Sequence, residues 1–154
     1  MKENKGFTLI EIMVVLALSA IILTVIITSY YDLAKKQALD KDYLSVASLL
    51  DQAKSSAINS KSASQYGVYF ASSSAVLFKG QTYVSNNITN QTYLLNNRVS
   101  ISALNLVGSS TDRVLFSRLT GYANASGTIT LSLKDSPTTK KIIKVYKTGV
   151  IEYK

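Results

Sequence analysis

The sequence contains no cysteine and no histidine, and its single proline is Pro137. Without cysteine, the chain has neither a disulfide bond nor a thiolate metal site. The absence of histidine removes the commonest general base and metal ligand. The acidic residues of the polar part show no compact metal-binding spacing, and no phosphate-binding loop is present. We therefore expect no catalytic residues, no metal site and no cofactor.

One segment lacks charge altogether, because residues 12–27 include no acidic or basic side chain. With its flanks it forms an apolar run over residues 7–31, long enough for a helix that crosses a hydrocarbon core of about 30 Å. Glu11 interrupts this run near its start. A carboxylate at the centre of a membrane costs about 2.5–3.5 kcal/mol, so an acid in such a segment indicates function and needs a partner.

The residues that enter this run form the motif Lys5-Gly6-Phe7-Thr8-Leu9-Ile10-Glu11. Followed by a long apolar helix, the motif resembles the N-terminal signature of type IV pilins and type II secretion pseudopilins. The resemblance implies that residues 1–6 are a leader peptide, which a prepilin peptidase removes between Gly6 and Phe7. It also implies N-methylation of the new Phe7 amine and a role for Glu11 in assembly.

The spacing of Phe7 and Glu11 supports that role on physical grounds. After cleavage Phe7 carries a cationic amine, and Glu11 lies one turn further along, about 6 Å away on the helix axis. A second helix displaced by one turn places its amine beside this carboxylate, and burying both charges together costs far less than burying either alone. The pair then sets the axial register of assembly. In two other interpretations, Glu11 pairs with its own N-terminus or reaches the membrane interface.

Gly6 has no Cβ, so a peptidase can approach the backbone at the cut. The alternative is a glycine that only makes a turn. The sequence suggests no specific role for Thr8, a residue that the start of a helix tolerates. An ordinary secretory signal, cut near residues 17–19, is the alternative to the pilin-type leader. We disfavour it because that cut falls inside the apolar block.

After Tyr31 the chain becomes polar but keeps helical spacing. Steps of three and four residues join one apolar stripe: Leu39, Tyr43, Val46, Leu50, Ala53 and Ala57. No glycine or proline interrupts residues 7–65, so one continuous helix is allowed. We predict a transmembrane and assembly helix at residues 7–31, and its amphipathic second half with a linker at residues 32–65.

Residues 66–154 show short alternating apolar runs between turn residues, which predicts an antiparallel β-sheet domain. The predicted strands cover residues 66–71, 75–79, 92–95, 98–102, 114–117, 128–133, 141–147 and 150–153. The fold class is therefore α+β: a long N-terminal helix, transmembrane in its first half and amphipathic in its second, packed on a C-terminal antiparallel β-sheet domain.

This second half resembles the GspH/FimT group of minor pilins and pseudopilins. The resemblance rests on the segments 66–70, 75–78, 114–117, 127–131 and 149–151, and on Gly121. Major pilins often carry a helix-kinking proline in the middle of the span, and residues 21–29 have none. This difference favours a minor component.

The resemblance implies a structural subunit of a type IV pilus, a type II secretion pseudopilus or a competence filament, and not an enzyme. Its implied partners are the prepilin peptidase, other pilins or pseudopilins, and an inner-membrane assembly platform. The implied location is the cytoplasmic (inner) membrane, crossed once with the N-terminus cytoplasmic and the C-terminal domain outside, and then an extracytoplasmic filament. Lysines flank both ends of the span, so charge alone leaves its orientation open.

The net charge is +8, and Lys140, Lys141, Lys144 and Lys147 form a basic cluster. Such a cluster suits DNA phosphates or an acidic surface. A minor pilin that binds DNA or a surface through its sheet domain is therefore the alternative function. The strand period divides these lysines between two faces, so nucleic acid is the less favoured partner. An exported enzyme or lipid-tethered domain is a further alternative, which the missing histidine and cysteine make unattractive.

Overall fold

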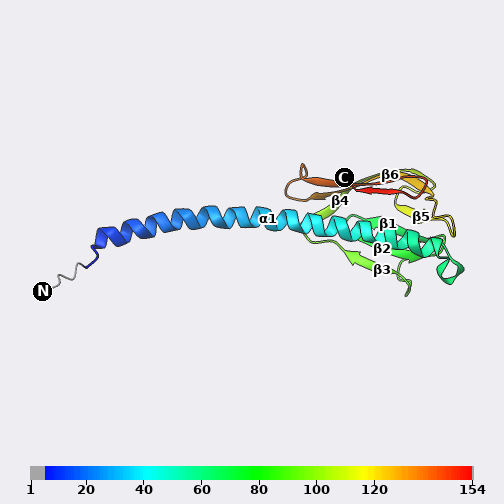
Figure 1. Ribbon diagram of the computed structural model, residues 1–154, viewed down its shortest axis with the longest axis horizontal. Coiled ribbons are helices and arrows are strands. Elements are labelled where there is room, and N and C mark those ends of the chain that lie inside the picture. The colour runs from blue at the N-terminus through cyan, green and yellow to red at the C-terminus, as the bar shows by residue number, and fades with distance from the viewer. Residues whose placement is uncertain (1–5, 154) are drawn as a thin grey trace. The chain divides into compact units, whose positions relative to one another are not determined.

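The computed structural model describes residues 6–153, except for the side chains of residues 25–29. Residues 1–5, most of the predicted leader, lie outside the described part of the chain. Two compact units divide between Lys36 and Gln37. The helix α1 (Leu9–Ile58) contributes to both units, and all the strands belong to the second (Figure 1).

In the first unit, α1 begins at Leu9 because Thr8 caps it. The Glu11 backbone N–H donates to the Thr8 hydroxyl oxygen at 3.3 Å, which satisfies one of the free donors of the first turn. Further along, the hydroxyls of Ser19 and Thr24 donate to carbonyls one turn earlier, at 2.7 and 2.9 Å. These two hydroxyl groups are therefore hydrogen-bonded within the helix itself.

Among the residues that the structure describes, no helix combines the length and the apolar character that crossing a membrane requires.

In the second unit, α1 ends at Ile58, earlier than the uninterrupted sequence allows. Ser60 adopts a left-handed φ of 50°, which an L-residue cannot keep within a helix. A short 3₁₀ turn, η1 (Lys61–Ala63), follows and leads into the first strand. The helix therefore stops because small polar residues favour a turn here, without glycine or proline.

Eight strands follow in two antiparallel four-stranded sheets: β1 (Tyr66–Ala71), β2 (Ser74–Lys79), β3 (Gln91–Leu94), β4 (Val99–Gly108), β5 (Arg113–Phe116), β6 (Ala125–Leu133), β7 (Lys140–Val145) and β8 (Ile151–Tyr153). The first sheet has the order β3-β2-β1-β5 and the second β4-β6-β7-β8. The strands lie close to the predicted ones. The division into two sheets was not predicted from the sequence.

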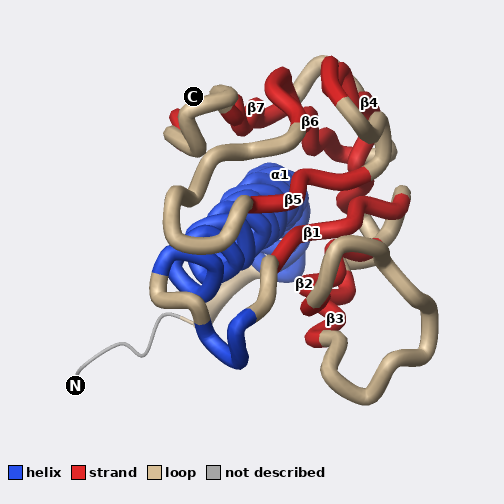
Figure 2. Tube along the Cα trace, turned by 90° about the vertical axis from the view of Figure 1, so that its right-hand side faces the viewer, coloured by secondary structure: helices blue, strands red, loops and turns tan. Residues whose placement is uncertain are grey.

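The second part of α1 packs against both sheets, whose strands lie beside the helix in Figure 2. All six residues of the predicted stripe are buried, and Leu50 at its centre is 0% exposed. Alternate residues of the strands meet them, for example Val68 in β1 and Ile129 in β6. Burying these side chains together is the main stabilising term of the unit. The predicted apolar stripe is therefore the face of the helix that lies in the core.

The first sheet also carries a small apolar cluster on the face that points away from the helix. Phe78 is 0% exposed there and lies opposite Gly67 in the register. A Cβ at Gly67 would lie only 2.8 Å from the Phe78 ring, so the absence of a side chain makes room for it. Tyr83 covers the cluster: its ring stacks on Tyr69 at 4.2 Å and meets Phe78 edge-on at 5.7 Å.

Candidate assembly site at the start of the helix

Thr8 and Glu11 organise the first turn of α1. A threonine followed three residues later by glutamate is the spacing of a capping box, and the structure shows its threonine half. The cap fixes Glu11 at the third helical position, where the positive end of the helix dipole favours a carboxylate. Thr8, for which the sequence suggested no role, therefore positions the predicted assembly acid. The capping-box spacing was the signal that could have revealed it.

Glu11 stands exposed within an apolar surface. Its carboxylate forms no ion pair within the described residues. Large apolar side chains around it are exposed as well, and Phe7 reaches 80%. They comprise Phe7, Leu9, Ile10, Ile12, Met13, Val14, Val15, Leu16, Leu18, Ile21, Ile22 and Leu23. Because they face all sides of the helix, this segment suits burial by apolar partners on every side.

Gly6 and Phe7 lie just before the helix, outside any strand or helix, and both are exposed. Gly6 is absent from the residues with positive φ, and a Cβ on it would meet nothing within 4 Å in the described chain. Neither a turn nor close packing therefore requires glycine at this position. The turn interpretation of Gly6 has no support here, whereas an accessible backbone suits an enzyme that cuts after Gly6.

The family described as the prokaryotic N-terminal methylation motif matches residues 1–27, which include Gly6, Phe7 and Glu11. The chain therefore carries a pilin-type N-terminal signature, and in this segment it is pilin-like. Proteins with this signature and this fold are structural subunits and not enzymes. No curated protein matches the chain in sequence.

The fold of this pilin-like protein is similar to that of a solved minor pilin. The crystal structure of the type IV minor pilin FimU from Pseudomonas aeruginosa (strain PAO1) matches with a TM-score of 0.54 and 10% identity, over 75% of this chain and 92% of that one. At this identity the likeness shows the fold alone. The predicted α+β class, with a long helix packed on an antiparallel sheet domain, is confirmed.

The basic cluster of this pilin-like protein is divided, as the strand period predicted. Lys141 lies on the helix side of β7, where its Nζ is 3.1 Å from a carboxylate oxygen of Asp40. Lys144 lies on the other side, with its Nζ 4.6 Å from the centre of the Tyr146 ring. Interaction with the Tyr146 side chain raises the pKa of the Lys144 ammonium group. The Tyr146 hydroxyl in turn donates to Glu152 at 2.6 Å, so acids accompany this cluster on both faces.

Two carboxylates of α1 fix the helix to the two sheets. Asp42, only 2% exposed, accepts a hydrogen bond from the Tyr93 hydroxyl of β3 at 2.8 Å and one from the Asn96 backbone N–H at 2.7 Å. Asp51 accepts a hydrogen bond from the Tyr153 hydroxyl of β8. Burial, followed by this bond, raises the pKa of Tyr153 to about 12. Neither contact could be predicted from sequence patterns, because the partners are far apart along the chain.

Proposed function

We propose that this protein is a minor pilin or pseudopilin, assembled through its N-terminal helix into a type IV pilus, a type II secretion pseudopilus or a competence filament. The precursor is anchored in the cytoplasmic membrane, with its sheet domain outside. A prepilin peptidase cleaves it between Gly6 and Phe7, and Phe7 is then methylated on its amine. The observation that carries the proposal is the start of α1, where one acid stands in an exposed, apolar first turn behind an accessible glycine.

Cleavage creates the second half of the assembly site. The new amine of Phe7 lies just before the positive end of the α1 dipole, where a cation is unfavourable. Methylation keeps the positive charge, so the amine still needs a carboxylate. The Glu11 carboxylate of a neighbouring helix meets that need when the two helices are displaced by about one turn.

The apolar surroundings of the Phe7 amine and the Glu11 carboxylate explain why this pair would set the axial register of two helices. A carboxylate and an ammonium group that are buried apart each cost several kcal/mol, and that cost falls greatly when the two meet. Apolar side chains around the helix provide adhesion in almost any register, since burial is non-directional. The ion pair therefore selects one register out of many. The absence of proline from residues 21–29 and the likeness to a solved minor pilin support a minor role.

The alternative role, binding of DNA or a surface through the basic sheet domain, has less support. Lys141 is already paired with Asp40, and Glu152 lies opposite Lys144 in the register of β7 and β8. A groove that tracks a phosphate backbone needs cations gathered on one face. These lysines are divided between two faces of the second sheet.

Intact-mass and N-terminal analysis of protein extracted from membranes tests the proposal directly. We expect a chain that begins at Phe7 and carries one added methyl group. A chain that begins at Met1, or one that begins after the apolar segment, would overturn the proposal.

Two variants separate processing from assembly. Gly6→Val should accumulate as the full-length precursor on a gel, because a side chain then blocks the cut. Glu11→Leu should be processed normally but should not enter filaments. The matched control is Asp32→Asn, which removes an acid just beyond the apolar run and should assemble normally. Normal filament incorporation of Glu11→Leu would contradict the register mechanism.

A further inference from the structure

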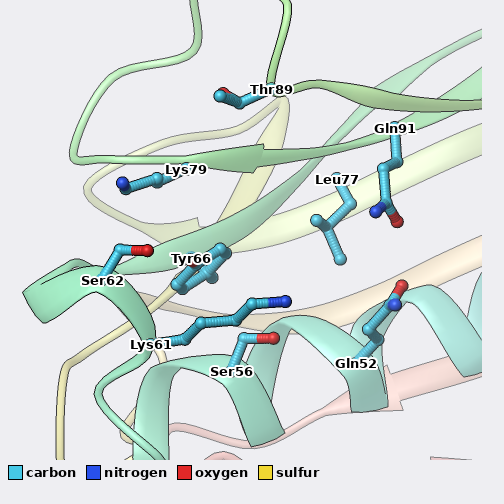
Figure 3. A pocket seen from close by; sticks show the side chains of 9 residues that line it. All are labelled: Gln52, Ser56, Lys61, Ser62, Tyr66, Leu77, Lys79, Thr89 and Gln91. Atoms are coloured by element: carbon cyan, nitrogen blue, oxygen red, sulfur yellow. The ribbon is translucent and has the colours of Figure 1, made fainter.

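A polar pocket of about 210 Å³ lies where the end of α1 meets η1 and the edge of the first sheet (Figure 3). Gln52 of α1, Lys61 of η1 and Gln91 of β3 contribute to its walls, and Tyr66 and Leu77 form apolar surface within it. Five separate segments of the chain thus converge on one small space. This pocket is far in the sequence from the assembly site and shares no residue with it.

The charge around this pocket is of one sign. Two of its lining residues are lysines, Lys61 and Lys79, and none is acidic. The chain has no aspartate or glutamate anywhere in residues 52–111. Within the described residues, neither lysine forms a salt bridge. The pocket therefore favours an anionic ligand.

The lining side chains also have unused hydrogen-bonding capacity. Tyr66 is 6% exposed as a whole residue, and no buried polar side-chain atom of the described residues lacks a hydrogen-bond partner, so its hydroxyl, for which the structure shows no protein partner, is accessible to a ligand. Figure 3 shows the Lys61 side chain extended across the pocket with its ammonium end toward the side of Gln52 and Gln91. Amide side chains both donate and accept hydrogen bonds, which matches the hydroxyl groups of a sugar.

Size narrows the ligand class further. A space of about 210 Å³ corresponds to about seven water molecules at about 30 Å³ each, more than a bare inorganic anion fills. A single sugar ring fits such a space. The Tyr66 ring and the Leu77 side chain offer apolar surface for the C–H face of a sugar, and Lys61 offers a charge-assisted hydrogen bond to a carboxylate.

We infer that this pocket binds an acidic sugar, with Lys61 holding the carboxylate and Gln52 and Gln91 holding the hydroxyls. A free uronic acid and a uronic acid residue of a polysaccharide present the same chemistry. The inference is independent of filament assembly and goes beyond the proposed function. The sheet domain would then bind a ligand independently of the contacts that assemble the filament.

Calorimetric titration of the full-length chain in a neutral detergent tests this inference. The probes are galacturonate, galactose, inorganic phosphate and polygalacturonate. We expect galacturonate to bind at least tenfold more tightly than galactose or phosphate, and its affinity to fall as salt is added. Tighter binding of polygalacturonate would assign the site to a polysaccharide, and binding of the monomer alone would assign it to a free sugar acid. No binding of galacturonate, or equal binding of galactose or phosphate, overturns the inference.

Variants locate the binding within the molecule. Lys61→Gln should weaken galacturonate binding about tenfold or more, because it removes the charge that pairs with the carboxylate. Tyr66→Phe should weaken it severalfold without lowering the melting temperature, since the fold loses no hydrogen bond. Lys134→Gln, at an exposed lysine outside the pocket, is the matched control and should bind as the parent chain does. Unchanged affinity in Lys61→Gln and Tyr66→Phe would place any binding elsewhere and refute the site.

Discussion

Replacing Asp42 with alanine tests how the helix is held to the first sheet. The carboxylate is 2% exposed and accepts one hydrogen bond from β3 and one from the turn that follows it. Burial, with a smaller contribution from Asp42, raises the pKa of Tyr93, so its hydroxyl remains a donor at neutral pH. Asp42→Ala leaves this hydroxyl and the Asn96 N–H without their acceptor.

The expected loss follows from these two bonds. Hydrogen bonds to a charged group contribute about 1.5–3 kcal/mol each, and two bonds that share one carboxylate add up incompletely. Alanine recovers about 0.5 kcal/mol through its higher helix propensity, and a buried charge is no longer desolvated. The free energy of unfolding should therefore fall by about 2–4 kcal/mol. At about 4 °C per kcal/mol for a domain of this size, the melting temperature should fall by about 8–16 °C.

The sequence offers a matched control two residues away. Asp40 also forms an ion pair from α1, at 3.1 Å to Lys141, but its side chain is 53% exposed. An exposed pair contributes about 1 kcal/mol or less, so Asp40→Ala should melt close to the parent chain. Tyr93→Phe removes one of the two hydrogen bonds to Asp42, so its melting temperature should lie between those of Asp42→Ala and Asp40→Ala. Thermal unfolding in neutral detergent, followed by near-ultraviolet circular dichroism of the tyrosines, measures all three. If Asp42→Ala loses no more stability than Asp40→Ala, the buried carboxylate does not fix the helix.

Three further changes test the second unit. Burial and the bond to Asp51 raise the pKa of Tyr153 to about 12, so folding favours the neutral hydroxyl; this stabilisation is complete below about pH 10 and is lost as the pH rises to about 12. The difference in unfolding free energy between the parent chain and Tyr153→Phe should shrink over that interval, and a constant difference would contradict the linkage. Leu50→Ala should cost about 2–5 kcal/mol in urea unfolding, because Leu50 is 0% exposed in the core, and an unchanged midpoint would count against its core position. Gly67→Ala should cost about 1–3 kcal/mol, since its Cβ would lie 2.7 Å from the backbone carbonyl oxygen of Val114 and 2.8 Å from the Phe78 ring; parent-like stability would show that both the neighbouring strand and the ring move aside freely.

The helix stripe and the strands were predictable because their signals are local. A step of three or four residues places Leu39, Tyr43 and Leu50 on one helix face whatever surrounds them. Alternation likewise places Ile129, Leu131 and Leu133 on the buried face of β6. Such patterns depend only on backbone geometry and on the presence of some core. They carry no information on which sheet a strand joins.

The extent of β4 shows where the pattern fails. The sequence predicted a strand that ends at Ser102, whereas β4 continues to Gly108. Its register against β6 shifts between Ile101 and Ala103, which leaves Ser102 as an extra residue. The shift moves the buried face from the odd position of Ile101 to the even position of Leu106. A bulge thus interrupts the alternation while the strand itself continues.

The pairing of β5 with β1 could not be predicted from local sequence patterns, for a different reason. Its neighbours in the chain, β4 and β6, pair with each other in the other sheet, and β5 alone crosses to the first. The register that joins Val68 to Val114 spans a long stretch of chain. Pairing at that distance is decided by the fit of side chains in the assembled core, for example where Phe116 packs at 0% exposure.

The candidate site at the start of the helix could be proposed from the sequence because its residues are contiguous in the chain. Gly6, Phe7 and Glu11 fall within six residues, so no long-range pairing is needed to bring them together. The structure adds Thr8 as the cap and shows that the described chain supplies Glu11 with no cation of its own. The start of α1 therefore has an exposed apolar surface and a carboxylate, that of Glu11, without an ion-pair partner in the described chain. Docking of a second helix, as we propose, resolves both at once: apolar burial supplies the strength of the contact, and the ion pair decides its register.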